Sequence, residues 1–139
     1  MIGGNKIFKG ASAGIAVYDN GKAYIQANEI IDHVQAGVGI RSGSVVSLVD
    51  NKIQGGSDAG VVCSDGAECV ITGNDITSNA RAGVAVMTRG VASISSNNIQ
   101  FNGKFWLTFS PPPHHHVLPY LPVSLSPYLP VSCLPVSRV

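Results

Sequence analysis

Apolar and polar residues alternate in short runs along most of the chain, and Gly and Asn separate these runs. Ile15 and Val17 belong to one run, and Ala23 and Ile25 belong to the next. Alternation over short segments bounded by turn residues is typical of β-strands. No 3.6-residue periodicity continues far enough for a helix. The pattern therefore predicts an all-β structure made of short strands.

The same pattern returns every 23 residues without insertion or deletion. Asn occupies one position of this frame, at Asn5, Asn28, Asn51, Asn74 and Asn97. An Ala-Gly pair occupies another, at Ala13-Gly14, Ala36-Gly37, Ala59-Gly60 and Ala82-Gly83. A fixed period of this length indicates a solenoid. With three short strands per repeat, it predicts a right-handed parallel β-helix of four to four and a half coils, stacked ~4.8 Å apart.

The frame also predicts which residues stack in the interior. Side chains of one column repeat every 23 residues and share an inward direction. Four columns are Ile15, Val38, Val61, Val84; Val17, Ile40, Cys63, Val86; Ile25, Leu48, Ile71, Ile94; and Ala23, Val46, Cys69, Ala92. The fifth column is Ile7, Ile30, Ile53, Ile76 and Ile99. One coil cannot bury this face alone, so stability must come from neighbouring coils.

Three further columns have polar or special roles in this prediction. Asn tolerates the left-handed backbone of a sharp corner, and stacked side-chain amides can form a hydrogen-bonded ladder. The Gly of Ala-Gly is expected at a second corner, where a Cβ would clash. The position after Asn carries charges of alternating sign on a solvent face, at Lys6, Glu29, Lys52 and Asp75.

Composition divides the chain into a repeat domain, 1–103, and a Pro-rich tail, 104–139. Every Gly lies between Gly3 and Gly103, and every Pro lies between Pro111 and Pro135. Pro at this density cannot join a sheet, so the tail is predicted to be disordered or polyproline II. The frame expects Ala-Gly where Phe105-Trp106 stand, although Leu107 and Phe109 fit the inward positions of a residual half-coil.

No capping segment precedes Asn5, and the repeat gives way directly to the tail. Solenoids normally carry atypical terminal repeats that cover their open edges. The sequence therefore suggests a piece of a longer protein, with a tail from a different reading context.

Charge and cysteine content narrow the function classes. The net charge is +1 and only 12% of residues are charged, which predicts neither a nucleic-acid nor a membrane partner. The N-terminus has no apolar segment of the kind that signal peptides need. Cys63 and Cys69 are expected in the core as small hydrophobes, where a disulfide is conceivable, and Cys133 would stay unpaired. An unpaired Cys suits a reducing compartment, so we predict an intracellular protein, cytoplasmic or nuclear.

The pattern of Asn5 to Phe8, Gly14 to Val17 and Asn28 to Ile30 resembles a known repeat. It is similar to the parallel β-helix repeats of the pectin-lyase-like superfamily, of the carbohydrate-binding and sugar-hydrolysis type. Within that group it looks most like the β-helices of F-box-only ubiquitin-ligase receptors and of SHC-binding spindle proteins. The resemblance covers residues 1–103 and implies a scaffold for protein recognition.

Enzymes of that superfamily work through surface acids, so we sought acids on neighbouring coils. Asp19 and Asp65 share a column two coils apart, about 9.6 Å by stacking, and Arg41 lies close to the coil between them. The competing interpretation is that these are turn residues, since Asp and Ser favour corners. His33 is assigned to a loop position without a second ligand nearby. No catalytic residue, metal site or cofactor site is predicted.

Three hypotheses of function remain open. The first is a non-catalytic scaffold that binds a protein, as the substrate-binding part of a ubiquitin-ligase receptor does. The second is a carbohydrate-binding or polysaccharide-degrading β-helix, and the third is a truncated fragment without independent function. Val45, Val49, Val70 and Val91 are apolar residues at outward strand positions, and Tyr24 and Met87 are apolar residues elsewhere on the predicted surface. Apolar columns on a sheet face can mark a partner site. The alternative is that a missing part of the parent protein covers them.

Overall fold

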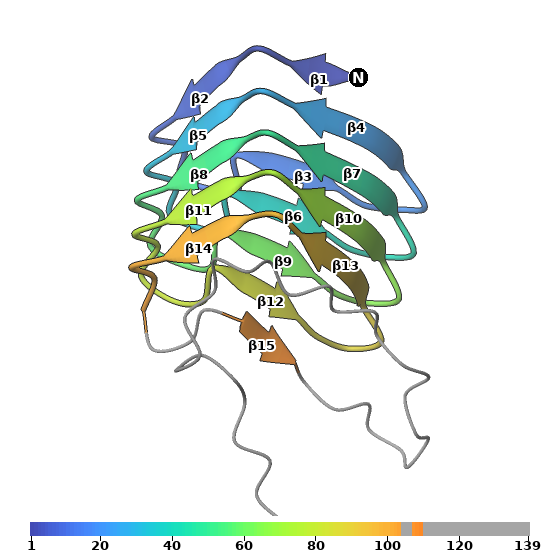
Figure 1. The fold of residues 1–139 in the computed structure, drawn as a ribbon. Helices are drawn as coiled ribbons and strands as arrows, with labels where there is room; N and C mark the ends of the chain where they lie inside the picture. The colour runs from blue at the N-terminus through green and yellow to red at the C-terminus, as the bar shows by residue number, and fades with distance from the viewer. Residues whose placement is uncertain (104–106, 110–139) are drawn as a thin grey trace, which may run out of the picture.

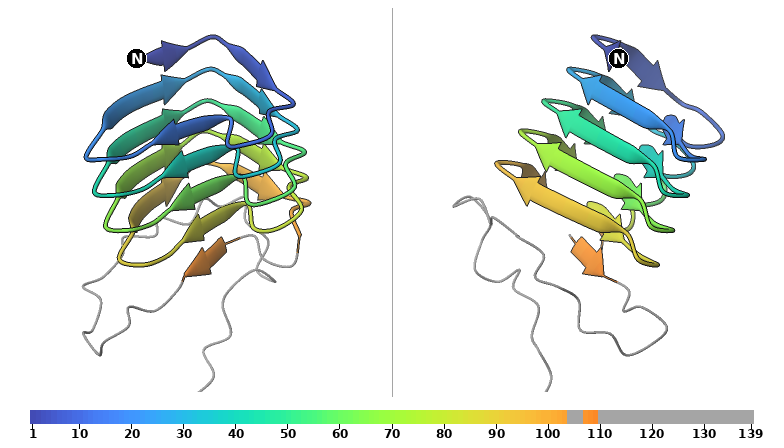
Figure 2. Two further views of the ribbon diagram at one scale, coloured as in Figure 1. Left: turned by 180° about the vertical axis from the view of Figure 1, so that it is seen from behind. Right: turned by 90° about the vertical axis from the view of Figure 1, so that its right-hand side faces the viewer.

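The computed structural model describes residues 1–103 and, by backbone alone, residues 107–109. The described residues form fifteen short strands and no helix. The strands wind around one axis, and each circuit lies beside the previous one (Figure 1). Successive strands enter three sheets in turn, and each sheet runs the length of the stack (Figure 2).

The three sheets contain five strands each among the described residues. Sheet A consists of β1 (Ile2–Gly3), β4 (Lys22–Gln26), β7 (Val45–Val49), β10 (Glu68–Thr72) and β13 (Val91–Ser95). Sheet B consists of β2 (Lys6–Phe8), β5 (Glu29–Ile31), β8 (Lys52–Gln54), β11 (Asp75–Thr77) and β14 (Asn98–Gln100). Sheet C consists of β3 (Ile15–Val17), β6 (Val38–Ile40), β9 (Val61–Cys63), β12 (Val84–Val86) and β15 (Leu107–Phe109).

Each strand from β1 to β12 pairs in parallel with the strand three places later in the chain. Ile25 lies beside Leu48, and Leu48 lies beside Ile71, so the register advances by one repeat at each step. The same offset holds in sheets B and C. The predicted parallel β-helix with 23-residue coils is therefore confirmed.

The five predicted inward columns form the core. All their members pack in one apolar cluster, which also takes in Ile2 and Ala67. Ile7, Val17 and Ala23 of the first coil are only partly buried, because a coil packs against them on one side alone. Isoleucine and valine dominate the columns since β-branched side chains suit a pleated surface.

The predicted asparagine ladder is present. Asn51 Nδ2 donates to Asn74 Oδ1 at 2.9 Å, and Asn28 Nδ2 donates to Asn51 Oδ1 at 3.0 Å. Asn51 Nδ2 also reaches the carbonyl oxygens of Ile25 and Val49, at 2.9 and 3.0 Å. The ladder therefore satisfies buried backbone groups as well as its own amides.

The predicted left-handed backbone at this corner was placed one residue too late. The positive φ angles belong to the residues before Asn: Gly4, Ala27, Asp50, Gly73 and Ser96. Asn is required here for its hydrogen bonds, since each Oδ1 accepts both an amide proton and a backbone N–H from the previous coil. For example, the Asn28 N–H donates to Asn51 Oδ1 at 3.0 Å.

A second ladder, which the sequence analysis missed, contains His33. Asn79 Nδ2 donates to Asn102 Oδ1 at 2.9 Å, and Asn79 Oδ1 accepts the Gly56 N–H at 3.1 Å. His33 is 3% exposed and accepts the equivalent hydrogen bond on its own coil, because its Nδ1 accepts the Gly10 N–H at 3.2 Å. Nε2 lies 3.1 Å from the Ile7 carbonyl oxygen and so carries the proton. His33 is thus a buried substitute for Asn rather than a plain loop residue.

The glycine of the Ala-Gly pair is required by close approach, as predicted. A Cβ on Gly37 would lie 2.5 Å from Ile53 Cγ2 and 2.8 Å from the Gly60 carbonyl oxygen. The φ angle of Gly37 is not left-handed, so the constraint is space alone.

The charged column behaves partly as predicted. Lys6 Nζ lies 3.6 Å from Glu29 Oε2, between exposed side chains. On the last coils Asp75 Oδ1 accepts a hydrogen bond from Asn98 Nδ2 at 2.7 Å. Exposed pairs of this kind contribute little to stability, about 0–1 kcal/mol.

The C-terminal boundary is less abrupt than the split at residue 103. Strand β15 continues sheet C beside β12, with Leu107 opposite Val84 and Phe109 opposite Val86. This strand is the residual half-coil that the frame allowed. The predicted disorder of the Pro-rich tail falls on residues 104–106 and 110–139, which lie outside the described residues.

Candidate binding groove on sheet C

A row of tight turns connects sheet C to sheet A. The Gly21 N–H donates to the Tyr18 carbonyl oxygen at 3.1 Å, and the same bond recurs in each later coil. Both central residues of each turn have positive φ: Asp19-Asn20, Ser42-Gly43, Asp65-Gly66 and Thr88-Arg89. Two positive φ angles in succession define a type I′ turn, for which Asp, Asn and Gly are the preferred residues. Asp19 and Asp65 therefore have a structural reason to occur where they do.

A row of loops connects sheet B to sheet C and carries a column of polar residues. Its members are Ser12, Gln35, Asp58 and Arg81, one per coil. Ser12 Oγ donates to Gln35 Oε1 at 3.2 Å, and Arg81 Nη1 lies 3.5 Å from Asp58 Oδ1. The four residues of this column therefore form one hydrogen-bonded pair and one ion pair.

Between the two rows, the outer face of sheet C around the first two coils is hollowed into a pocket of about 560 Å³, which we call the groove. This volume is within the range of ligand sites in proteins. Its lining comes from β3 and β6, the turns after them, the loops before them and, for Asp58, the loop before β9: Ser12, Ala13, Ala16, Val17, Tyr18, Asp19, Gln35, Ala36, Gly39, Arg41, Ser42 and Asp58.

Gly39 gives the pocket its low floor. The column to which it belongs carries Ala16, Val62 and Ala85 on the other coils. A methyl group at Gly39 would meet no heavy atom within 4 Å, and its φ angle is not left-handed. Neither sterics nor backbone geometry requires glycine here, although glycine weakens a strand. A glycine that the fold does not require often marks the close approach of another molecule.

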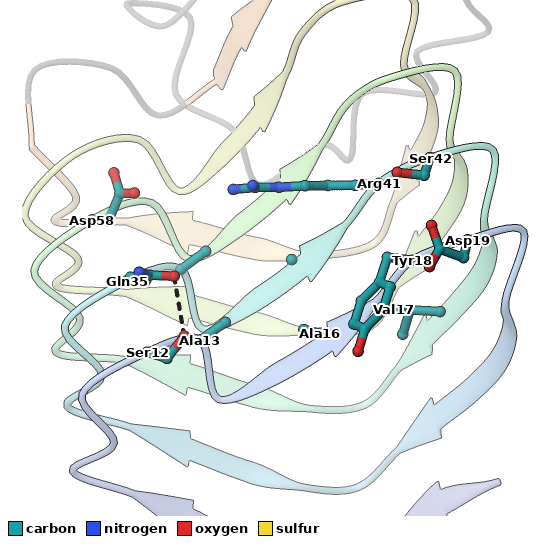
Figure 3. A pocket seen from close by; sticks show the side chains of 12 residues that line it. Ser12, Ala13, Ala16, Val17, Tyr18, Asp19, Gln35, Arg41, Ser42 and Asp58 are labelled. Atoms are coloured by element: carbon teal, nitrogen blue, oxygen red, sulfur yellow. Dashed lines mark hydrogen bonds between the residues drawn. The ribbon is translucent and has the colours of Figure 1, made fainter.

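Arg41 is the cationic group of the pocket. It follows β6 directly, and its side chain reaches across the groove toward the loop row that carries Gln35 and Asp58 (Figure 3). Within the described part of the chain its guanidinium makes no ion pair and no side-chain hydrogen bond. Its five N–H donors are therefore available to a ligand.

Of the three candidate residues predicted from the sequence, Asp19, Arg41 and Asp65, the structure brings only two together. Asp19 and Arg41 line the same pocket, whereas Asp65 does not. Asp65 is the first central residue of its turn and accepts a hydrogen bond from Ser64 Oγ at 3.2 Å. The acid that joins Asp19 in the pocket is Asp58, on the loop row. Asp58 escaped prediction because the path of a loop between strands cannot be read from alternation.

The outer face of sheet A is a second surface of interest. Its exposed apolar side chains are Tyr24 (40% exposed), Val45 (44%), Val70 (49%) and Val91 (47%). The register places Tyr24 beside Ser47, Val45 beside Glu68 and Val70 beside Ser93. The apolar residues are therefore diagonal neighbours from strand to strand, within reach of one another. We call these four residues, with Val49, the apolar band.

The two described cysteines are free thiols in the core. Cys63 Sγ donates to the Ala67 carbonyl oxygen at 3.3 Å. The neighbouring Cys63 thiol, as a hydrogen-bond partner, and burial together raise the pKa of Cys69 well above its ordinary value. Both groups are thus packed as small hydrophobes, and the conceivable disulfide is not formed.

Two general findings apply to the described residues. They contain no group of three or more His, Cys, Asp and Glu side chains arranged to hold a metal ion. None of them forms a helix with the length and apolar character that crossing a membrane requires.

Comparison with known families agrees with this architecture. The family described as right-handed beta helix region matches residues 1–110, so the match extends through β15. The chain therefore belongs to the right-handed β-helix family. Searches of curated proteins and of solved structures found no match to the chain.

Proposed function

We propose that the chain is a non-catalytic β-helix module that binds a protein partner. Its cellular role in this proposal is intracellular, as the substrate-binding part of a ubiquitin-ligase receptor, which the resemblance of its repeat implies. The observation that carries the binding role is the apolar band on sheet A.

The band suits a protein partner for two physical reasons. Parallel sheets are usually covered on both faces, and the core covers only the inner face of sheet A. Exposed apolar patches on a rigid surface are typical of interaction sites. The band lies on five-residue strands in unbroken register, so it is rigid before binding and loses little conformational entropy.

The carboxylates do not favour catalysis. A glycosidase gives its general acid a desolvated environment. Asp19 and Asp65 are exposed at the tips of turns, where water surrounds them. This supports the non-catalytic proposal.

The test compares two pairs of substitutions on the same coils. Val45→Lys with Val70→Lys places charge on sheet A, and Gln54→Lys with Thr77→Lys places the same charge on the outer face of sheet B. The full chain and both variants are used to capture proteins from cell extract, and the bound proteins are quantified by mass spectrometry. A captured protein is then purified and its affinity for the three chains is measured directly.

We expect one protein to bind the unmodified chain and the sheet B variant equally, and the sheet A variant at least tenfold more weakly. Equal binding to all three chains would contradict the proposal. So would turnover of a polysaccharide by the purified chain.

A carbohydrate function is the second candidate, and the pocket favours it. Tyr18, 62% exposed, stands at one side as a stacking surface, while Asp19 and Asp58 provide two carboxylates. Under this hypothesis the chain cleaves or binds oligogalacturonides, and Asp19→Asn with Asp58→Asn removes that activity. Release of reducing ends, measured for both chains, tests it.

A further inference from the structure

We propose that the pocket on sheet C binds an extended segment of the protein partner through an acidic side chain that pairs with Arg41. This inference rests on the proposed function and adds a second contact surface to it. It also states the chemistry of the segment: an extended backbone above Gly39 and a carboxylate at the guanidinium.

The shape of the pocket suits an extended chain. Four of the lining residues, Ala13, Ala16, Ala36 and Gly39, carry only a methyl group or a hydrogen atom, and Ala16 and Gly39 are neighbours on the sheet itself. An extended backbone is thin enough to lie close to such a floor, and the missing side chain of Gly39 creates the closest approach. A sugar ring would rely on aromatic stacking, and Tyr18 is the one aromatic side chain among the lining residues, at one end of the pocket.

The charges of the pocket single out Arg41. Asp58 is already paired with Arg81, and Gln35 is already paired with Ser12. Arg41 has neither kind of partner among the described side chains, so its charge is the one that a ligand would complement. A guanidinium offers a planar fork of donors that matches a carboxylate in a bidentate pair.

The negative charge of Asp19 is expected to weaken the binding of an acidic ligand. Asp19 lines the pocket on the turn side, near Tyr18. Its negative charge opposes the approach of a ligand carboxylate. Removing that charge should therefore strengthen binding, which a purely structural role of Asp19 in its turn would not explain.

One partner can reach both surfaces. Arg41 and Val45 stand on opposite sides of a single type I′ turn, since the Ser44 N–H donates to the Arg41 carbonyl oxygen at 3.2 Å and β7 begins at Val45. A chain that crosses this turn passes from the apolar band to the pocket within a few residues.

The experiment is a titration of the ¹⁵N-labelled full chain, followed by amide chemical shifts. The probes are two N-acetylated, C-amidated alanine pentapeptides, one with a central glutamate and one with a central glutamine. We expect the glutamate peptide to shift the amides of Gly39 and its pocket neighbours, and to bind at least tenfold more tightly than the glutamine peptide. In Arg41→Gln the preference should vanish, and in Asp19→Asn the glutamate peptide should bind about two- to fivefold more tightly.

Gly39→Val provides the shape control. Val62 already occupies this column on the next coil, and a Cβ at Gly39 has free space, so the variant should keep or raise the melting temperature. We expect it to lose peptide binding although Arg41 is unchanged.

Failure of the glutamate peptide to bind would overturn the inference, and so would three other results. One is equal affinity for the two peptides, and another is a set of shifts that lies away from the pocket. The third is tighter binding of digalacturonate than of the glutamate peptide, which would make the pocket a saccharide site. Peptide binding should survive Val45→Lys with Val70→Lys. If the glutamate peptide does not bind but partner capture still depends on Val45 and Val70, this inference is wrong and the proposed function stands. If the peptide binds at the pocket but partner capture does not depend on those valines, the proposed function of the apolar band is refuted.

Discussion

Single residues in this β-helix are constrained by what the equivalent atom does in the neighbouring coil. His33 shows this directly, because its two ring nitrogens take the positions that Oδ1 and Nδ2 take in Asn79. The imidazole and the amide are different chemical groups, but both present an acceptor and a donor at the spacing that the buried backbone requires. Side-chain identity matters less here than donor and acceptor geometry.

This equivalence gives a prediction at the residue scale. His33→Asn should change the free energy of unfolding by less than about 1 kcal/mol, because Asn restores both hydrogen bonds. His33→Leu should cost about 2 kcal/mol or more, because the Gly10 N–H and the Ile7 carbonyl oxygen both lose their partners. Urea denaturation followed by circular dichroism measures the difference. Equal losses in the two variants would show that His33 acts only by filling space.

The type I′ turns give a second prediction at this scale. Thr88 and Arg89 hold positive φ angles of 43° and 62°, which L-residues adopt at a cost of about 1–2 kcal/mol each. Thr88→Asp with Arg89→Gly copies the turn at Asp65-Gly66 and should raise the unfolding free energy by about 1–2 kcal/mol. Ser42→Asp, in a turn that already has Gly43, should change it little. A melting temperature that falls in the double variant would contradict this explanation.

Individual strands are too short to be stable alone, so the elements depend on ladders that run across them. Strands of two to five residues gain their stability from the strands beside them and from the two side-chain ladders. Because the ladders run inside the corners, they fix the direction of each chain reversal as well as the spacing of the coils.

The ladder should be strongest at its centre. Asn51, 2% exposed, serves the Asn28 N–H, the Ile25 carbonyl oxygen and two neighbouring amides, whereas Asn5 is exposed at the end. We expect Asn51→Ala to lower the free energy of unfolding by about 2 kcal/mol or more, and Asn5→Ala to lower it by less than about 1 kcal/mol. Chemical denaturation of both variants checks this, and equal effects would argue against cumulative burial along the ladder.

The sequence was a good guide to the elements and a poor guide to the loops. A strict period and strand alternation predicted the columns of Ile7 and Ile25, the asparagine ladder and the close approach at Gly37. The position of the left-handed residue was missed by one, because a corner needs both a special φ and a buried amide and the sequence does not say which residue does which. The ladder of His33 was missed because its column mixes Gly, His and Asn.

The candidate site was predicted only in part for a similar reason. Asp19 and Arg41 were found because strand register places them on adjacent coils. Asp58 and Gln35 lie on loops, whose path depends on packing against the sheet and not on alternation. Asp65 was included in the predicted site because strand register does not distinguish an acid that forms a turn from an acid that binds a ligand.

The whole molecule is a stack of interchangeable coils, which predicts tolerance to the removal of one repeat. Deleting residues 51–73 joins Asp50 to Asn74 and leaves every remaining strand in its sheet. We expect a cooperatively unfolding β-protein with a lower melting temperature, because one interface between coils is lost. Deleting residues 51–60 removes β8 without its coil, interrupts the order of the three sheets, and should abolish cooperative unfolding. Circular dichroism melts distinguish the two outcomes.

The alignment of all strand hydrogen bonds along the stacking direction has a mechanical consequence. Tension applied to the two ends of the stack loads the bonds between one pair of coils at a time, as in a zipper, whereas tension across the stack is shared by every coil. Each detached coil of 23 residues releases about 75 Å of extended chain. When the molecule is pulled from its two ends, it is therefore expected to lengthen in steps of nearly equal size. Its mechanical resistance is lowest along the stacking axis, which is also the direction in which its coils repeat most regularly.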